Sequence, residues 1–213
     1  MSSLGQKRFY TLEEYFSLAK NSEERYEYWH GEIFCMSGGS KEHAFIATNV
    51  ARRLGNQLEG RNCRVINSDM AIKVPTAPPL RYADLSVACG GLEFETVNGI
   101  DLLINPILLV EVLSGTTQRF DRHQKFEFYK SIPAFREYLL ITQYQPSITQ
   151  YLKQGDGTWQ GSEVIGLDSQ IYLPSIDCTL QLSEVYQSGA RKPPLQFCFS
   201  KISGGMNRVL KEK

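Results

Sequence analysis

The sequence predicts an α/β domain with a mixed central sheet flanked by helices, with a hairpin before the sheet and a β meander at its end. Short apolar or alternating segments recur after residue 60, which is the pattern of strands. Residues 40–58 and 118–130 instead carry apolar side chains at helical spacing. The chain has 213 residues, of which 42% are hydrophobic. This length and composition favour one globular domain.

The charge of the chain is unevenly distributed. We expect a single domain over residues 9–187 and a basic tail over residues 188–213, outside the core. Residues 189–213 hold six basic side chains and one acidic one, so residues 1–188 keep 17 basic and 22 acidic side chains, a net charge of −5. Binding of nucleic acid by bulk charge is therefore excluded, and contact would need a local basic groove or a divalent metal. The tail is either a basic arm or a solvated end.

The five cysteines stand far apart without a CxxC pair, so the sequence indicates neither a disulfide framework nor a zinc site. We expect reduced thiols. The N-terminal segment lacks the apolar core of a secretory signal. The longest apolar run, residues 107–110, is too short to cross a bilayer. A soluble cytoplasmic protein is the expectation.

Caps and turns predict the elements that precede the sheet. Thr11 and Glu14 form a capping box at the start of a short helix. Residues 25–36 read as two strands around a His-Gly turn, which predicts a hairpin. Ser40 then caps a long helix that runs through Leu58.

Strands dominate the rest of the chain. A helix over residues 118–130 interrupts them, residues 90–105 are expected to be a loop, and residues 182–186 a closing helical turn. The predicted strands cover residues 63–74, 82–89, 106–113, 136–144, 148–153, 159–165 and 171–180.

Glu111 is the most informative single residue. Its segment, residues 107–113, is apolar on both faces, which is typical of a buried central strand. An isolated carboxylate in such a strand costs several kcal/mol, so Glu111 needs a partner. The partner is either a buried Arg or Lys, in a structural pair, or a metal or substrate, in a catalytic site.

Asp84 is a second unusual acid. Ala83, Leu85 and Val87 form one apolar face of its predicted strand, and Asp84 points to the other face. Acids are disfavoured inside strands, and an acid alone would be a solvated residue near a strand end. With Glu111 on the following strand, two carboxylates could converge to hold Mg²⁺ or Mn²⁺, since hard cations favour oxygen ligands.

Lys125 shares a helical stripe with Phe128, Tyr129 and Ile132, and this stripe should face the sheet. An inward ammonium needs carboxylates nearby; the alternative is an exposed pair with Asp121, worth about 0.3–0.5 kcal/mol. The two acids and the lysine together suggest one site. There the metal and the lysine would polarise a phosphodiester, stabilise developing charge and help to activate water.

The segments around these residues resemble the PD-(D/E)XK nuclease superfamily and, more narrowly, the Uma family of restriction-endonuclease-like proteins. Asp84 stands in Tyr-Ala-Asp-Leu-Ser-Val, and Glu111 in Leu-Leu-Val-Glu-Val-Leu-Ser. The likeness covers roughly residues 9–187. Further matching segments are residues 26–33, 40–43, 68–70, 120–121 with Lys125, and 136–139.

The resemblance implies a restriction-endonuclease-like core and cleavage of DNA that depends on Mg²⁺ or Mn²⁺. Asp84 and Glu111 would be catalytic residues that bind the metal. Leu113 stands where the superfamily has its strand lysine. We therefore assign the catalytic amine to Lys125 on the helix, with Lys73 as the alternative donor.

Other residues are implied in supporting roles. Tyr129 with Lys125 resembles the QxxxY element of related nucleases, with Lys in place of Gln. Glu32 could add a third acid, and His43 could contact the metal-bound water or the phosphate; a solvated histidine is the alternative. Six arginines could line a phosphate-binding rim: Arg52, Arg53, Arg61, Arg64, Arg119 and Arg122.

Two other functions stay open at this point. One is a catalytically silent relative that acts as a nucleic-acid-binding or assembly module, which the missing strand lysine at Leu113 favours. The other is a metal-dependent hydrolase of some other phosphoester. Retention of both acids favours an enzyme, because a silent core would gain stability by losing buried charge. A homodimer is expected, since a double-strand cut usually takes two active sites.

Overall fold

The computed structural model describes residues 8–36, 39–76, 80–114 and 121–188. Its centre is a six-stranded sheet in the order β12-β11-β10-β9-β6-β3, in which β9 and β10 are parallel and the other neighbours antiparallel. This mixed sheet confirms the predicted α/β class. The strands are β3 (Cys63–Asn67), β6 (Leu85–Cys89), β9 (Leu108–Leu113), β10 (Glu137–Thr142), β11 (Ser147–Lys153) and β12 (Trp159–Ile165).

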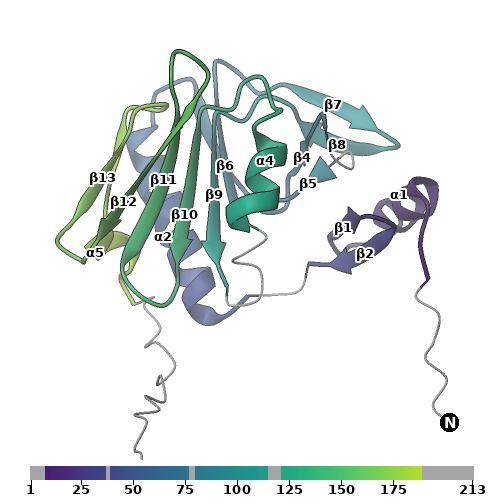
Figure 1. The fold of residues 1–213 in the computed structure, drawn as a ribbon, viewed down its shortest axis with the longest axis horizontal. Helices are drawn as coiled ribbons and strands as arrows, with labels where there is room; N and C mark the ends of the chain where they lie inside the picture. Colours follow the sequence, from purple (N-terminus) through teal and green to yellow (C-terminus); the bar gives the residue numbers. More distant parts are fainter. Residues whose placement is uncertain (1–7, 37–38, 77–79, 115–120, 189–213) are drawn as a thin grey trace, which may run out of the picture.

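Helices cover both faces of this sheet, with α2 (Lys41–Gln57) behind it and α4 (Phe126–Tyr129) in front (Figure 1). All six residues of β9 are buried, as predicted for a central strand. Because side chains alternate along a strand, Val110 and Val112 pack in the core on the α2 side, and Leu109 and Leu113 pack in the core on the α4 side. Glu111 therefore points to the α4 side.

A smaller sheet, in the order β5-β4-β8-β7, lies beside the first. Together with the N-terminal elements it forms a third apolar cluster around Tyr15, Leu80 and Leu102. The structure describes no helix long and apolar enough to cross a membrane. The remaining elements are α1 (Leu12–Lys20), β1 (Tyr26–Trp29), β2 (Glu32–Cys35), β4 (Ala71–Lys73), β5 (Leu80–Arg81), β7 (Phe94–Val97), β8 (Ile100–Leu103), β13 (Gln170–Leu173), β14 (Cys178–Gln181) and α5 (Leu182–Val185).

The caps and turns predicted near the N-terminus are present. Thr11 and Glu14 form a reciprocal capping box at α1. His30 and Gly31 both adopt positive φ, of 46° and 84°, and join β1 to β2. Ser40 caps α2, and its side chain accepts the N–H of His43 at 3.1 Å. Each of these signals is local, which is why the sequence alone identified them.

Two predictions in the first half of the chain were wrong. The expected strand over residues 63–74 is broken by a turn at residues 68–70, so that β3 and β4 belong to different sheets. The expected loop over residues 90–105 contains the β7–β8 hairpin. Its turn is Asn98-Gly99, with φ of 51° and 84°, and an Asn-Gly pair is a strong hairpin signal in a sequence.

The second half also departs from prediction at two places. Residues 171–180 form the β13–β14 hairpin instead of one strand. The predicted helix over residues 118–130 begins, within the described chain, as a π-helix at Asp121–Lys125 (η1) and continues as α4. Residues 118–120 lie outside the described residues. The closing turn is confirmed as α5.

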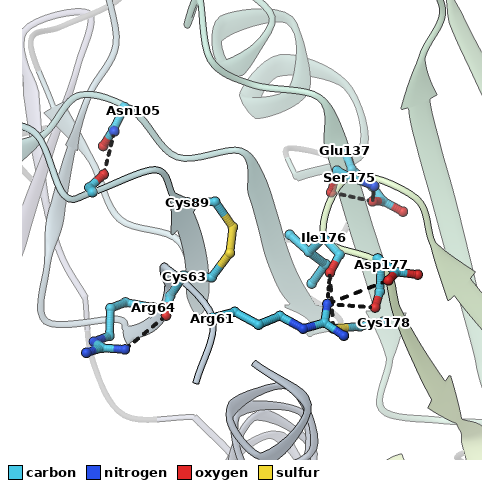
Figure 2. Close-up of a disulfide and its surroundings, with 11 residues drawn as sticks. Arg61, Cys63, Arg64, Cys89, Asn105, Glu137, Ser175, Ile176, Asp177 and Cys178 are labelled. Atoms are coloured by element: carbon cyan, nitrogen blue, oxygen red, sulfur yellow. Dashed lines mark hydrogen bonds and ion pairs between the residues drawn. A yellow bond between two sulfur atoms is a disulfide. The ribbon is translucent and has the colours of Figure 1, made fainter. Parts of the chain in front are cut away.

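A disulfide joins Cys63 to Cys89, which contradicts the expectation of reduced thiols for this pair (Figure 2). The two residues are 26 positions apart, but the antiparallel pairing of β3 with β6 sets them directly opposite each other. Spacing along the chain could not show this, because it is produced by strand register. Cys35 and Cys178 are free thiols in the structure, and Cys198 lies outside the described residues.

A buried carboxylate that the sequence analysis did not single out lies on β10. Glu137 is fully buried; it accepts the hydroxyl of Ser175 at 2.6 Å and the backbone N–H of Ser175 at 3.1 Å (Figure 2), and a hydrogen bond from the Gln150 amide. Burial raises the pKa of Glu137, and these hydrogen bonds oppose the rise in part. The folded protein therefore binds this proton more tightly than the unfolded chain does.

This difference predicts a pH dependence. The contribution of Glu137 to stability is fully present below its ordinary pKa of 4.5 and is lost as the pH rises from there through the raised folded value. Between pH 4 and pH 8 the wild type should lose more stability than Glu137→Gln, as measured by urea denaturation. The exposed Glu59→Gln is the matched control and should follow the wild type. A wild type and a Glu137→Gln variant with parallel pH profiles would contradict the prediction.

Candidate active site

Asp84 lies immediately before β6, so it is not inside the strand as predicted. Leu85 stands opposite Val110, and one step along this antiparallel register sets Asp84 beside Glu111. The Oδ2 atom of Asp84 accepts the backbone N–H of Val112 at 2.7 Å. This hydrogen bond holds the Asp84 carboxylate against Val112, the residue after Glu111. The two predicted acids are therefore neighbours.

His43 approaches Asp84 from the first turn of α2. Its Nε2 atom lies 3.0 Å from Asp84 Oδ2, and both side chains are about one-fifth exposed, at 22% and 21%. The Ser40 cap orients this turn, and the Ser40 hydroxyl itself donates to the side-chain oxygen of the buried Gln143 at 2.5 Å. His43 is therefore held in place and is not a freely solvated residue.

Glu111 is only 4% exposed, and its partners come from η1 and α4, on the face of the sheet to which Glu111 points. Its Oε1 atom lies 3.0 Å from the Nζ of Lys125 and accepts the hydroxyl of Tyr129 at 3.0 Å. These contacts supply the partner that a buried carboxylate requires. A buried Lys–Glu pair is compatible with both interpretations of Glu111, the structural pair and the catalytic site.

Lys125 points inward, as its helical stripe predicted, and is 3% exposed. Besides Glu111, it contacts the backbone oxygen of Tyr82 at 2.9 Å and lies 3.9 Å from Glu27 Oε1. Lys125 is the last residue of η1, and π-helical turns occur frequently at functional sites. The side chain of Asp121, its proposed exposed partner, lies outside what the structure describes.

Glu27 on β1 is a member of this group that sequence analysis missed. It is 6% exposed, and its Oε1 atom accepts the backbone N–H of Tyr82 at 3.0 Å. The available signal was an acid between two tyrosines in a predicted strand. Glu32, the third acid that the sequence suggested, is half-buried at the start of β2, opposite Trp29 in the hairpin.

Arg81 is a second missed residue and is fully buried. Its Nη1 atom donates to the backbone oxygens of Tyr28 and Leu80, and its guanidinium lies over the rings of Trp29 and Phe128, at 5.1 and 5.7 Å. Burial lowers the pKa of Arg81, and Glu27 opposes this shift. The buried cations Arg81 and Lys125 thus match the buried acids Glu27 and Glu111 in number.

Several other predicted residues lie elsewhere. Lys73 is on β4 in an ion pair with Glu95, and its described contacts do not include Asp84 or Glu111. Arg53 pairs with Glu184 at 3.1 Å, and Arg61 binds the backbone oxygens of residues 176 and 177 (Figure 2). These two arginines hold α2 and its C-terminal extension to the C-terminal elements. Arg119 and the side chain of Arg122 lie outside the described residues.

The donor set at the site fits a hard divalent cation. Among the described residues no three His, Cys, Asp or Glu side chains gather as a metal cluster. The carboxylates of the candidate site are those of Asp84 and Glu111. Asp84 uses Oδ2 for both of its hydrogen bonds, and its Oδ1 makes none to the described residues. Mg²⁺ is usually bound by one or two carboxylates, with water and substrate phosphate oxygens as the other ligands.

The α/β fold of this chain is shared with a solved structure. A solved structure titled as a putative nuclease belonging to DUF820 from Anabaena variabilis aligns with a TM-score of 0.65. It covers 83% of this chain and 97% of its own, at 17% identity, so the similarity concerns the fold.

The family follows from the sequence comparisons. Residues 12–183 match the model of the Uma2 family, described as "Putative restriction endonuclease", and the chain belongs to this family. Two uncharacterised proteins of Synechocystis, slr1290 and sll1609, are 35% and 32% identical to it. The alignments cover 69% and 80% of this chain and 76% and 96% of the relatives. The resemblance noted in the sequence is confirmed.

Proposed function

We propose that the protein is a Mg²⁺-dependent endonuclease that hydrolyses phosphodiester bonds of DNA. The observation that carries this proposal is the convergence of Asp84, Glu111 and Lys125 from three separate segments of the chain. Membership of the Uma2 family supports the same activity. Two carboxylates beside a buried amine are a suitable arrangement for phosphoryl chemistry.

Each residue has a role that follows from its contacts. Asp84 and Glu111 would hold the metal, which when bound supplies positive charge at the phosphate and lowers the pKa of coordinated water. Lys125 stabilises negative charge that develops on the phosphate, and Tyr129 orients Glu111 through its hydroxyl. His43 orients Asp84 from the α2 side.

The net charge of −5 over residues 1–188 bears on how DNA would bind. Neutralisation of phosphates by basic side chains supplies most non-specific affinity for DNA. A body of this charge should bind DNA weakly without metal, and Mg²⁺ at the site offsets part of the repulsion. We propose that the protein acts as a homodimer, since cutting both strands then needs no second encounter.

A silent binding or assembly module is the second candidate. The observation that favours it is Leu113, which is fully buried where the superfamily has a lysine. In this case Lys125 and Glu111 form only a structural pair. Cleavage and metal binding distinguish the two candidates.

The direct test is cleavage of supercoiled plasmid by the pure protein with Mg²⁺ and with Mn²⁺. We expect cutting by the wild type and its loss in Asp84→Ala, Glu111→Ala and Lys125→Ala. Cutting by Lys125→Ala with loss in both acid variants would show that Lys125 is not the catalytic amine. Linear product that rises with the square of protein concentration would support the homodimer. Absence of cutting by the wild type with both metals would contradict the nuclease proposal.

Metal-linked stability gives a second prediction that does not depend on cutting. Mn²⁺ at 100 times its Kd should stabilise the wild type by about 2.7 kcal/mol, because it binds the folded state alone. Asp84→Ala should abolish this rise in melting temperature. The control Asp168→Ala removes an exposed acid outside the site and should keep it. An equal rise in both variants would show that Mn²⁺ binds elsewhere.

A further inference from the structure

The backbone of Tyr82 is held from two sides, through the two peptide groups that flank its Cα. Its N–H donates to Glu27 Oε1 at 3.0 Å, and its oxygen accepts from Lys125 Nζ at 2.9 Å. Both partners are buried charged side chains, and hydrogen bonds to charged groups are about twice as strong as neutral ones. The position of the Tyr82 backbone is therefore strongly restrained.

The backbone of Tyr82 links two members of the candidate site. It contacts Lys125 directly, and Asp84 follows it by two residues. A shift of this backbone would move the Tyr82 oxygen, which accepts the hydrogen bond from Lys125, and the start of the segment that carries Asp84. Placement of a catalytic group to within about 0.5 Å is what an efficient site requires.

Glu27 is also close enough to act on Lys125 itself. Its Oε1 atom lies 3.9 Å from Nζ, so Lys125 lies between two buried acids, Glu27 from the hairpin and Glu111 from the central sheet. Two acids on different elements define the position of the ammonium more closely than one does. The N-terminal hairpin thereby takes part in the geometry of a site that the central sheet carries.

A purely structural role for Glu27 would be to neutralise Arg81. The described hydrogen bonds of Arg81 go to the backbone oxygens of Tyr28 and Leu80, whereas the described contacts of Glu27 go to Tyr82 and Lys125. The contacts of Glu27 are thus directed at the site and not only at the neighbouring cation.

We propose that Glu27 is a positioning residue, which holds the backbone of Tyr82 and the side chain of Lys125 in the arrangement that the reaction needs. This inference rests on the proposed nuclease function for its catalytic consequence. Its geometric content, an energetic coupling between Glu27 and Lys125, holds independently of activity.

The test is a double-mutant cycle on the full chain with Glu27→Gln, Lys125→Gln and the double variant. Glutamine keeps an acceptor for the Tyr82 N–H and a donor for Glu111, so both single variants are designed to fold. Urea denaturation in metal-free buffer should give unfolding constants that depart from additivity by about fivefold or more, since contacting residues couple. The control is Glu24→Gln, an exposed glutamate on the same N-terminal segment, which should be additive with Lys125→Gln.

Cleavage kinetics give the second measurement. Glu27→Gln should lower kcat about tenfold with KM unchanged, because an interaction that positions a reacting group acts on the transition state. In the Lys125→Gln background the same change should have no further effect. Additive unfolding together with an equal loss of kcat in both backgrounds would overturn the proposal. If the wild type does not cut, the proposed function fails, and the unfolding cycle alone decides whether Glu27 positions Lys125.

Discussion

Replacing Lys125 by methionine is expected to lower the free energy of unfolding by about 3–5 kcal/mol. The ammonium lies 3.0 Å from Glu111 and 3.9 Å from Glu27, and all three side chains are less than one-tenth exposed. Methionine fills a similar volume but removes the ammonium that pairs with Glu111 and that also lies near Glu27. Removal of one partner from a buried ion pair costs far more than the pair itself contributes. Urea denaturation at pH 7 measures the loss.

Two variants make this expectation specific. Lys130→Met lies five residues further on and removes a side chain that pairs with Glu127 near the surface, so it should cost less than about 1 kcal/mol. The double variant Lys125→Met with Glu111→Leu should recover much of the loss, because an apolar pair can replace a buried ion pair. A loss that is equal for Lys125→Met and Lys130→Met would show that Lys125 is not buried against its acids.

Reduction of the Cys63–Cys89 disulfide is expected to cost about 3–4 kcal/mol. The bond closes a segment of 26 residues, and the loop-entropy relation for this length gives a stabilisation in that range. The segment includes β4, β5 and Asp84, so the disulfide restrains the part of the unfolded chain that carries Asp84. Urea denaturation with and without a phosphine reductant measures the difference.

The other cysteines provide the controls. Cys35→Ser removes an exposed free thiol and should keep the full sensitivity to reductant. The double variant Cys63→Ser with Cys89→Ser should denature at the midpoint of the reduced wild type and be indifferent to reductant. A reductant effect that persists in this double variant would assign the stabilisation to another pair of cysteines.

The predictions that succeeded depended on local chemistry or on a single strong pattern. The capping box at Thr11 and the cap at Ser40 need only their own turn, and the doubly apolar segment around Glu111 is unambiguous for a central strand. Strand continuity was harder, because a turn of three or four residues within a strand-like stretch barely changes its mean hydropathy. Residues 63–74 and 171–180 were therefore each read as one strand where the chain reverses or changes sheet.

The candidate site shows the same division. The helical stripe predicted the inward direction of Lys125, and the apolar patterns around Glu111 and Asp84 singled out both acids. The resemblance to a family added their metal-binding roles. Glu27 and Arg81 were missed because their roles depend on how the N-terminal hairpin packs against a strand more than 50 residues later. The partner of a buried charge is decided by tertiary structure, and the sequence shows only that a partner is needed.

The parallel pairing of β9 with β10 has a consequence for the newly made chain. On one of its edges, β9 pairs with β10, residues 137–142. These residues are made after the helix that supplies Lys125 and Tyr129. A growing chain that ends between residues 130 and 136 holds every residue of the candidate site and still lacks β10, the parallel partner of β9. The surroundings of the candidate site are then complete only after β10 has been made and has paired with β9.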